Sequence, residues 1–132
     1  MSLKAFLNPI KMDNKEVVIS NRFVEDGKPV PFVIRPISEA ENKDLMKKHT
    51  KRDKKGQENF DRYEYIHELV ALAVVEPDLT NAELQKAYGL GISKSLSNML
   101  NVGEFAELSQ AVQELSGLDT DINDDIEEVK NA

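Results

Sequence analysis

The amino-acid sequence predicts an α+β domain, mainly α, in which an N-terminal β-hairpin packs on a bundle of about five helices. Three observations support this class. β-Branched residues are concentrated in residues 15–35, apolar residues recur at helical spacing after residue 38, and helix-capping patterns precede those periodic segments. A chain of 132 residues, 40% of them apolar, is long enough for one domain with a substantial core. We expect this domain to cover residues 1–118, followed by a flexible acidic tail over residues 119–132.

Residues 15–35 are expected to form the β-hairpin. The first strand is rich in β-branched residues, and Asp26-Gly27 supplies turn chemistry. Val30, Phe32 and Ile34 then alternate along the second strand. The two prolines in this strand cannot donate hydrogen bonds to a ladder, so the strand should begin at a sheet edge.

Five helices are expected, over residues 38–50, 58–75, 81–88, 93–100 and 102–116. A capping box formed by Ser38 and Glu41 starts the first helix. Pro77 ends the second, because a residue before proline is pushed out of helical geometry. The segment between these two helices, residues 47–57, contains six basic residues and Gly56. It is interpreted as a helix end followed by a mobile loop.

The segment from residue 79 to residue 118 carries the clearest helix signals. Thr80 and Glu83 are spaced as a capping box, and Asn101 and Glu104 repeat that spacing. Gly117 follows the last periodic residue and is expected to end the final helix in a left-handed conformation. Because each such cap contributes about 1 kcal/mol, this segment should be a rigid helical scaffold.

A partner is expected to bind through apolar residues of the last helix or of the tail. The candidates share helical spacing: Phe105, Leu108, Val112 and Leu115 in the helix, and Ile122, Ile126 and Val129 in the tail. A stripe this regular more often faces the interior of a bundle, so burial is favoured over partner binding for the helix residues. The tail holds six acidic residues and one lysine, which suits either a segment that orders against a partner or a purely solubilising one.

Charge is distributed unevenly along the chain. Residues 1–56 hold 13 basic and 8 acidic side chains, a net charge of +5, whereas residues 57–132 hold 4 basic and 16 acidic ones, a net charge of −12. Such a split suits head-to-tail self-association or a basic partner. The simpler interpretation, which we favour, is one domain whose opposite charges all face solvent.

Motifs that carry chemistry are weak in this sequence. It contains no cysteine, which excludes disulfides and thiolate metal sites. His67-Glu68 resembles the start of a zinc-protease helix motif, but Ala71 stands where the second histidine is needed. Residues 89–95 resemble a phosphate-binding loop without its adjacent Gly-Lys-Ser or its preceding strand. We therefore expect no enzymatic activity, catalytic residue, metal or cofactor.

Residues 80–100 offer an alternative function, because they resemble a helix-turn-helix DNA-binding unit. Two features count against it. The turn is two residues too long, with Leu90-Gly91 inserted. The C-terminal half also has a net charge of −12, whereas a protein that binds in a DNA groove must neutralise phosphates with basic side chains. No nucleic-acid partner is expected.

Several segments, taken in order, resemble the XkdN-like phage tail assembly chaperones of Gram-positive phages and prophages. They are residues 16–23, 26–32, 34–38 and 103–117. No single segment is diagnostic, and the specificity lies in four modest matches in the right order at the right spacing.

The resemblance implies a non-enzymatic protein that binds the tape measure protein, keeps it soluble and helps to recruit tail tube subunits. It further implies that the protein is absent from the mature virion. Whether the protein forms a homo-oligomer is left open. No signal peptide or membrane-spanning segment is recognisable, so a cytoplasmic protein without a membrane partner is expected. A structural tail component is a further alternative.

Overall fold

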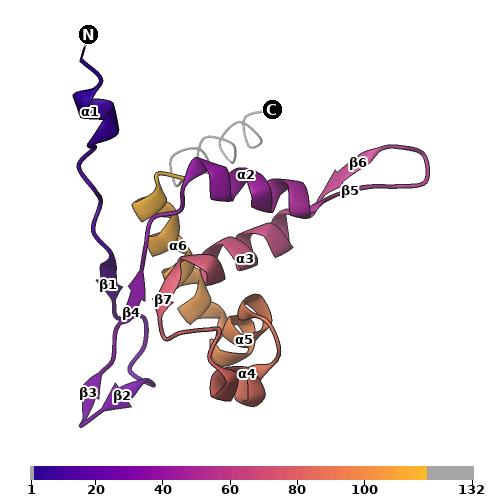
Figure 1. The fold of residues 1–132 in the computed structure, drawn as a ribbon. Coiled ribbons are helices and arrows are strands. Elements are labelled where there is room, and N and C mark those ends of the chain that lie inside the picture. Colours follow the sequence, from indigo (N-terminus) through magenta and orange to yellow (C-terminus); the bar gives the residue numbers. More distant parts are fainter. Residues whose placement is uncertain (1, 119–132) are drawn as a thin grey trace, which may run out of the picture.

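The computed structural model describes residues 2–118, and Figure 1 shows the arrangement of their secondary structure. The helices are α1 (Lys4–Leu7), α2 (Glu39–Lys48), α3 (Arg62–Ala73), α4 (Ala82–Tyr88), α5 (Ile92–Met99) and α6 (Val102–Ser116). The strands are β1 (Lys15–Val17), β2 (Val24–Glu25), β3 (Lys28–Pro29), β4 (Phe32–Ile34), β5 (Thr50–Arg52), β6 (Glu58–Phe60) and β7 (Val74–Glu76). The mixed α+β class is therefore confirmed, with helices predominating.

A three-stranded antiparallel sheet of order β1-β4-β7 forms one side of the domain. Lys15 lies opposite Ile34 and Val17 opposite Phe32, so β1 and β4 form the arms of the expected hairpin, while β2 and β3 pair at its tip. The third strand was not predicted. Its residues were assigned to a helix over residues 58–75, and the structure corrects this assignment at both ends. Val74 and Val75 continue the apolar pattern of α3, but both are β-branched, and pairing with β4 adds tertiary hydrogen bonds that favour the strand.

The basic segment after α2 is a β-hairpin, and its interpretation as a mobile loop is wrong. Strands β5 and β6 pair in antiparallel register and project away from the helices (Figure 1). The turn has a local cause, because the Asp53 carboxylate accepts hydrogen bonds from the amides of Lys55 and Gln57, each 2.9 Å long. Gly56 supplies the positive φ of 80° that the turn requires.

The core is built around α3, which packs against α2, α5 and α6. Side chains from these helices and from β4 meet in one apolar cluster. Its fully enclosed members are Ile34, Leu69, Val70, Ala73, Leu96, Leu108 and Val112. The cluster joins the sheet to the helices, which explains why the N-terminal hairpin and the C-terminal helices form one unit.

Apart from α3, two helix starts show how far the capping signals hold. Ser38 and Glu41 form the expected reciprocal box at α2. At α4, however, the cap is Asn81 rather than Thr80. The Asn81 side chain accepts from the amides of Glu83 and Leu84, while Asp78 accepts from both the amide and the hydroxyl of Thr80. The side-chain oxygen of Asn81 thus caps α4 in place of the predicted Thr80 hydroxyl.

The end of α6 agrees with the sequence analysis. Gly117 has φ 77°, and the Leu118 amide donates to the Gln113 carbonyl at 2.8 Å. These are the left-handed residue and the long return hydrogen bond of a Schellman motif. The helix bounds Val102–Ser116 also match those predicted.

Candidate partner-binding groove

The predicted partner-binding stripe of α6 is divided by the fold. Leu108 and Val112 have no exposed surface, so they are core residues and no partner can reach them. This outcome is the inward-facing one that the sequence favoured. Phe105 and Leu115 are partly buried against the same core. The tail candidates Ile122, Ile126 and Val129 lie outside the described residues.

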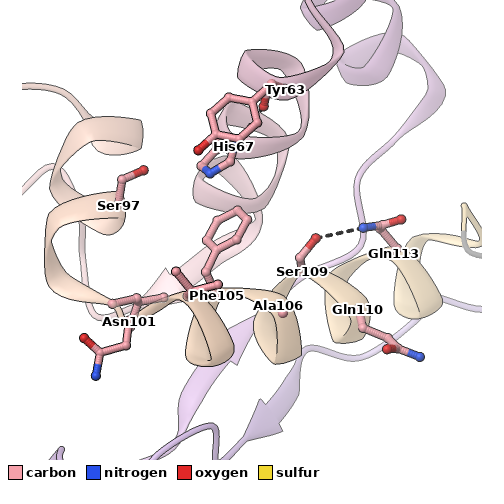
Figure 2. A pocket seen from close by; sticks show the side chains of 11 residues that line it. Tyr63, His67, Ser97, Asn101, Phe105, Ala106, Ser109, Gln110 and Gln113 are labelled. Carbon is pink, nitrogen blue, oxygen red and sulfur yellow. Dashed lines mark hydrogen bonds between the residues drawn. The ribbon is translucent and has the colours of Figure 1, made fainter.

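A groove of about 620 Å³ lies beside that core, between α3, the α5–α6 junction and the adjacent face of α6 (Figure 2). We call it the aromatic groove. Its walls are Tyr63, His67, Ser97, Leu100, Asn101, Val102, Phe105, Ala106, Ser109, Gln110 and Gln113. Of the four predicted candidates on α6, Phe105 alone belongs to it.

Three rings form a stack along the groove. The ring centroids of Tyr63 and His67 are 4.2 Å apart, and those of His67 and Phe105 are also 4.2 Å apart, with only 8° between the latter ring planes. His67 Nδ1 lies 2.8 Å from the Tyr63 carbonyl oxygen, a hydrogen bond that fixes the imidazole on α3. The Tyr63 and His67 rings are tilted by 34°, whereas the near-parallel contact of His67 with Phe105 links α3 to α6. The three rings together form an aromatic wall of the groove.

Large apolar surface remains accessible within the groove lining. Val102 is 89% exposed and Tyr63 is 70% exposed, although both line the groove. On α6 the polar side of the groove is held by Gln113, whose Nε2 donates to Ser109 Oγ at 2.8 Å (Figure 2). Within residues 2–118, the lining contains no Asp, Glu, Lys or Arg. Such a surface can hold an apolar chain, and it offers no activated nucleophile and no paired acid and base.

The start of α6, which positions Val102 and Phe105, is anchored by an ion pair. Glu104 accepts hydrogen bonds from Arg22 Nε at 2.9 Å and from the Asn101 amide at 2.7 Å. Arg22 also donates to the Met99 carbonyl at 3.1 Å. The Arg22 hydrogen bond is the main reason why the pKa of Glu104 falls to about 2. One side chain preceding β2 thus fixes both the end of α5 and the beginning of α6.

Sequence reasoning missed most of this groove for a physical reason. Val102, Ala106, Ser109 and Gln113 occupy an α6 face next to the predicted stripe, and the face is too polar to register as a binding surface. One signal was available in Val102, an apolar residue in the first turn of a helix whose core stripe begins only at Phe105. The meeting of the α3 rings with Phe105 depends on tertiary packing alone.

The remaining motifs are placed as follows. Glu68, the second residue of the zinc-protease-like pair, lies 2.6 Å from Lys48 Nζ in an ion pair. Across residues 2–118, no three His, Cys, Asp or Glu side chains are grouped so that they could hold a metal ion. The two helices of the helix-turn-helix alternative are present as α4 and α5. Ser95 and Leu96 of α5 are completely buried, so these two residues cannot contact DNA bases. Among the helices of residues 2–118, none is long and apolar enough to cross a membrane.

Comparison with known proteins identifies the family. The model of the phage XkdN-like tail assembly chaperone proteins matches residues 3–130. The chain belongs to this family. The resemblance drawn from the ordered motifs is thereby confirmed, and the match spans the β-sheet, all of the helices that line the aromatic groove, and most of the acidic tail.

Two relatives of this XkdN-like protein come from Bacillus subtilis (strain 168). The phage-like element PBSX protein XkdN is 28% identical over 129 aligned residues, which cover 92% of this chain and 87% of the relative. An uncharacterized protein, YqbN, is 30% identical over the same span and coverage. The crystal structure of YqbN superposes with a TM-score of 0.77 at 25% identity, covering 89% of this chain and 97% of that one.

Proposed function

We propose that this protein is a non-enzymatic chaperone of phage or prophage tail assembly, and that it binds a helical segment of the tape measure protein in the aromatic groove. One observation carries the proposal. This member of the tail assembly chaperone family has an open groove on its surface, in which Val102 and Tyr63 are exposed beside an aromatic wall. Exposed apolar surface bordered by polar residues is typical of protein-binding sites.

The shape and chemistry of the groove favour a helix with an apolar face. Helix-in-groove recognition needs apolar or aromatic contacts at helical spacing rather than reactive groups. Val102, Phe105 and Ala106 follow that spacing along α6, and Tyr63 faces them from α3. The polar groups at the other end of the groove are uncharged, so an apolar client loses little solvation energy there.

The charges around the groove favour a client with basic flanking residues. Helix α6 has no lysine or arginine, and two of its glutamates, Glu107 and Glu114, remain after Glu104 pairs with Arg22. Electrostatic complementarity of this kind selects partners and accelerates association more than it adds affinity. We further propose that the same complex recruits tail tube subunits in the cytoplasm of the host and is released before the virion is complete.

Co-expression with the tape measure protein tests the proposal. We expect the client to co-purify with the wild-type chain and to stay soluble. The exposed groove substitutions Val102→Asp and Tyr63→Ser should reduce the recovered client about tenfold, as expected for loss of an anchoring contact. Val18→Asp is the matched control, because Val18 is 55% exposed and lies outside both the groove and the adjoining hollow that shares Tyr63 with it. Equal recovery with all three variants would remove the aromatic groove as the client site.

Mass spectrometry of purified tails separates the chaperone role from that of a structural tail component. We expect tape measure and tube peptides, with no peptides of this protein above the background of the preparation. Stoichiometric recovery in finished tails would contradict the chaperone assignment.

A further inference from the structure

The projecting hairpin β5–β6 and the last turn of α2 form a strongly basic surface, called here the basic hairpin and defined as residues 47–60. Residues 47–57 hold six basic side chains and one acidic one, a net charge of +5. The single carboxylate, that of Asp53, accepts hydrogen bonds from two amides of the turn. Four exposed lysines form no ion pair within residues 2–118, namely Lys47, Lys51, Lys54 and Lys55. The described part of the chain thus leaves this positive charge unbalanced.

Two exposed apolar side chains are joined by a series of contacts at the base of the basic hairpin. The Phe60 ring is 42% exposed, and its centroid lies 5.3 Å from that of Tyr65. The Tyr65 hydroxyl donates to the side-chain oxygen of Asn42 on α2. The Asn42 nitrogen lies 3.9 Å from the sulfur of Met46, which is 44% exposed. The base of the hairpin therefore combines apolar surface with basic side chains, which suits an acidic segment that carries apolar anchors.

The end of α6 lies where the following residues can reach this surface. Ser116 Oγ accepts a hydrogen bond of 2.9 Å from the Ile37 amide, so α6 ends beside the beginning of α2. From there α2 leads to the basic hairpin (Figure 1), and its ten residues span about 15 Å. The fourteen residues 119–132 span about 21 Å as a helix and at most about 46 Å when extended. Either conformation is long enough to reach the hairpin of the same chain.

The composition of residues 119–132 complements the basic hairpin. Six acidic side chains and one lysine give these residues a net charge of −5, equal in magnitude to the +5 of residues 47–57. Three apolar side chains recur among them at helical spacing, namely Ile122, Ile126 and Val129. They match the apolar pair Met46 and Phe60. A tethered segment has an effective concentration on the order of millimolar, which favours contact within one chain over contact between copies.

We propose that residues 119–132 dock on the basic hairpin of their own chain. Their carboxylates face the four lysines that lack an ion pair, and their apolar side chains cover Met46 and Phe60. The contact shields positive charge that would otherwise attract polyanions such as nucleic acids. It involves no residue of the aromatic groove and does not depend on the client proposed for that groove.

Paramagnetic relaxation enhancement in the full chain tests the proposal. The sequence contains no cysteine, so Asn131→Cys provides a single site for a nitroxide label. We expect the amide signals of residues 50–60 to lose most of their intensity, because a nitroxide broadens the signals of nearby protons. The signals of residues 24–29, at the opposite end of the molecule (Figure 1), should keep theirs. Addition of 1 M salt shortens the Debye length to about 3 Å and should restore the hairpin signals.

Charge reversal in the basic hairpin should abolish the broadening. The variant carries Lys47→Glu, Lys51→Glu, Lys54→Glu and Lys55→Glu. The matched control makes the same change in net charge at exposed lysines outside the hairpin, with Lys11→Glu, Lys15→Glu, Lys28→Glu and Lys86→Glu, and should keep the broadening. Replacement of the six tail carboxylates by lysine in the hairpin variant should restore it, because the two charges are again opposite.

Four outcomes would overturn the proposal. The first is a labelled wild-type chain without broadening in residues 50–60, and the second is equal broadening in the charge-reversed hairpin. The third is comparable broadening when a nitroxide-labelled chain is mixed with a separate isotope-labelled chain, which would make the tail of a second copy the occupant. The fourth is a single-stranded DNA oligonucleotide that binds the hairpin equally well with and without the tail carboxylates, which would make nucleic acid the occupant.

Discussion

The two neighbouring faces of α6 differ sharply in what they contact. One face places Leu108 and Val112 in the core with no exposed surface, whereas the next leaves Val102 89% exposed at the rim of the aromatic groove. Phe105 stands between them and contributes to both. A single helix can thus stabilise the domain and present a binding surface, since residues three or four apart share one face.

The comparison implies that the core face should be intolerant of change. Leu108→Ala removes a fully enclosed side chain and leaves a cavity, so the free energy of unfolding should fall by about 2–5 kcal/mol. Val102 is 89% exposed on the other face, so Val102→Ala should change the free energy of unfolding by less than about 0.5 kcal/mol. Urea denaturation of the two variants measures both values. Similar losses at the two positions would break the distinction between the faces.

The anchor at the beginning of α6 should show a smaller, pH-dependent effect. Hydrogen bonds to Glu104, first from Arg22 and then from the Asn101 amide and Ser20, lower its folded-state pKa from 4.5 to about 2, so the carboxylate stabilises the fold above pH 4.5. That contribution is lost as the pH falls from 4.5 towards 2. Arg22→Met should therefore lower the melting temperature at neutral pH, and its deficit relative to wild type should shrink over this acidic range.

The control for this anchor is the ion pair on the projecting hairpin. Arg52 and Glu58 are both exposed and lie 3.3 Å apart, so Arg52→Met should have little effect at any pH. A pH-independent deficit in Arg22→Met would mean that its packing, rather than its charge, fixes the helix start.

The two glycines of α6 sharpen the comparison between its ends. Gly117 adopts φ 77°, so Gly117→Ala should destabilise the domain by about 1 kcal/mol. Gly103 lies in the first turn with open space around it, and Gly103→Ala should stabilise by about 0.5–1 kcal/mol. Thermal unfolding of the pair measures both signs. A stabilising Gly117→Ala would contradict the left-handed cap.

The smallest effect on stability is expected from the N-terminal arm, the exposed residues 2–14 that precede β1. Deletion of residues 2–13 removes no buried side chain, so under conditions where the chain is monomeric the free energy of unfolding should change by less than about 0.5 kcal/mol. Chemical denaturation at low protein concentration provides the measurement. A loss comparable with that of Leu108→Ala would show that the arm belongs to the core.

Locally encoded features were predictable from the sequence, and features made by tertiary contacts were not. The bounds of α6, the Ser38 box and the Gly117 cap depend on residues within one or two turns, and all three were predicted. Strand β7 looked like the end of α3, because Val74 and Val75 continue its apolar pattern until they pair with β4. Strand β5 consists of Thr50, Lys51 and Arg52, which show no apolar alternation.

The candidate site follows the same rule. Phe105 was identified from its helical spacing, but its grouping with Tyr63 and His67 requires α3 and α6 to pack together. Val102 lies between the predicted cap residues Asn101 and Glu104 and was not predicted as a contact surface. Prediction of the groove would have required the helix–helix arrangement, which periodicity alone does not provide.

Site-specific photo-crosslinking in cells tests the central claim most directly. A photoreactive amino acid at position 102, in cells that also express the tape measure protein, should crosslink to that protein, whereas the same group at the exposed position 18 should not. Crosslinks to the tape measure protein from position 18 but not from position 102 would contradict the aromatic groove as the client site.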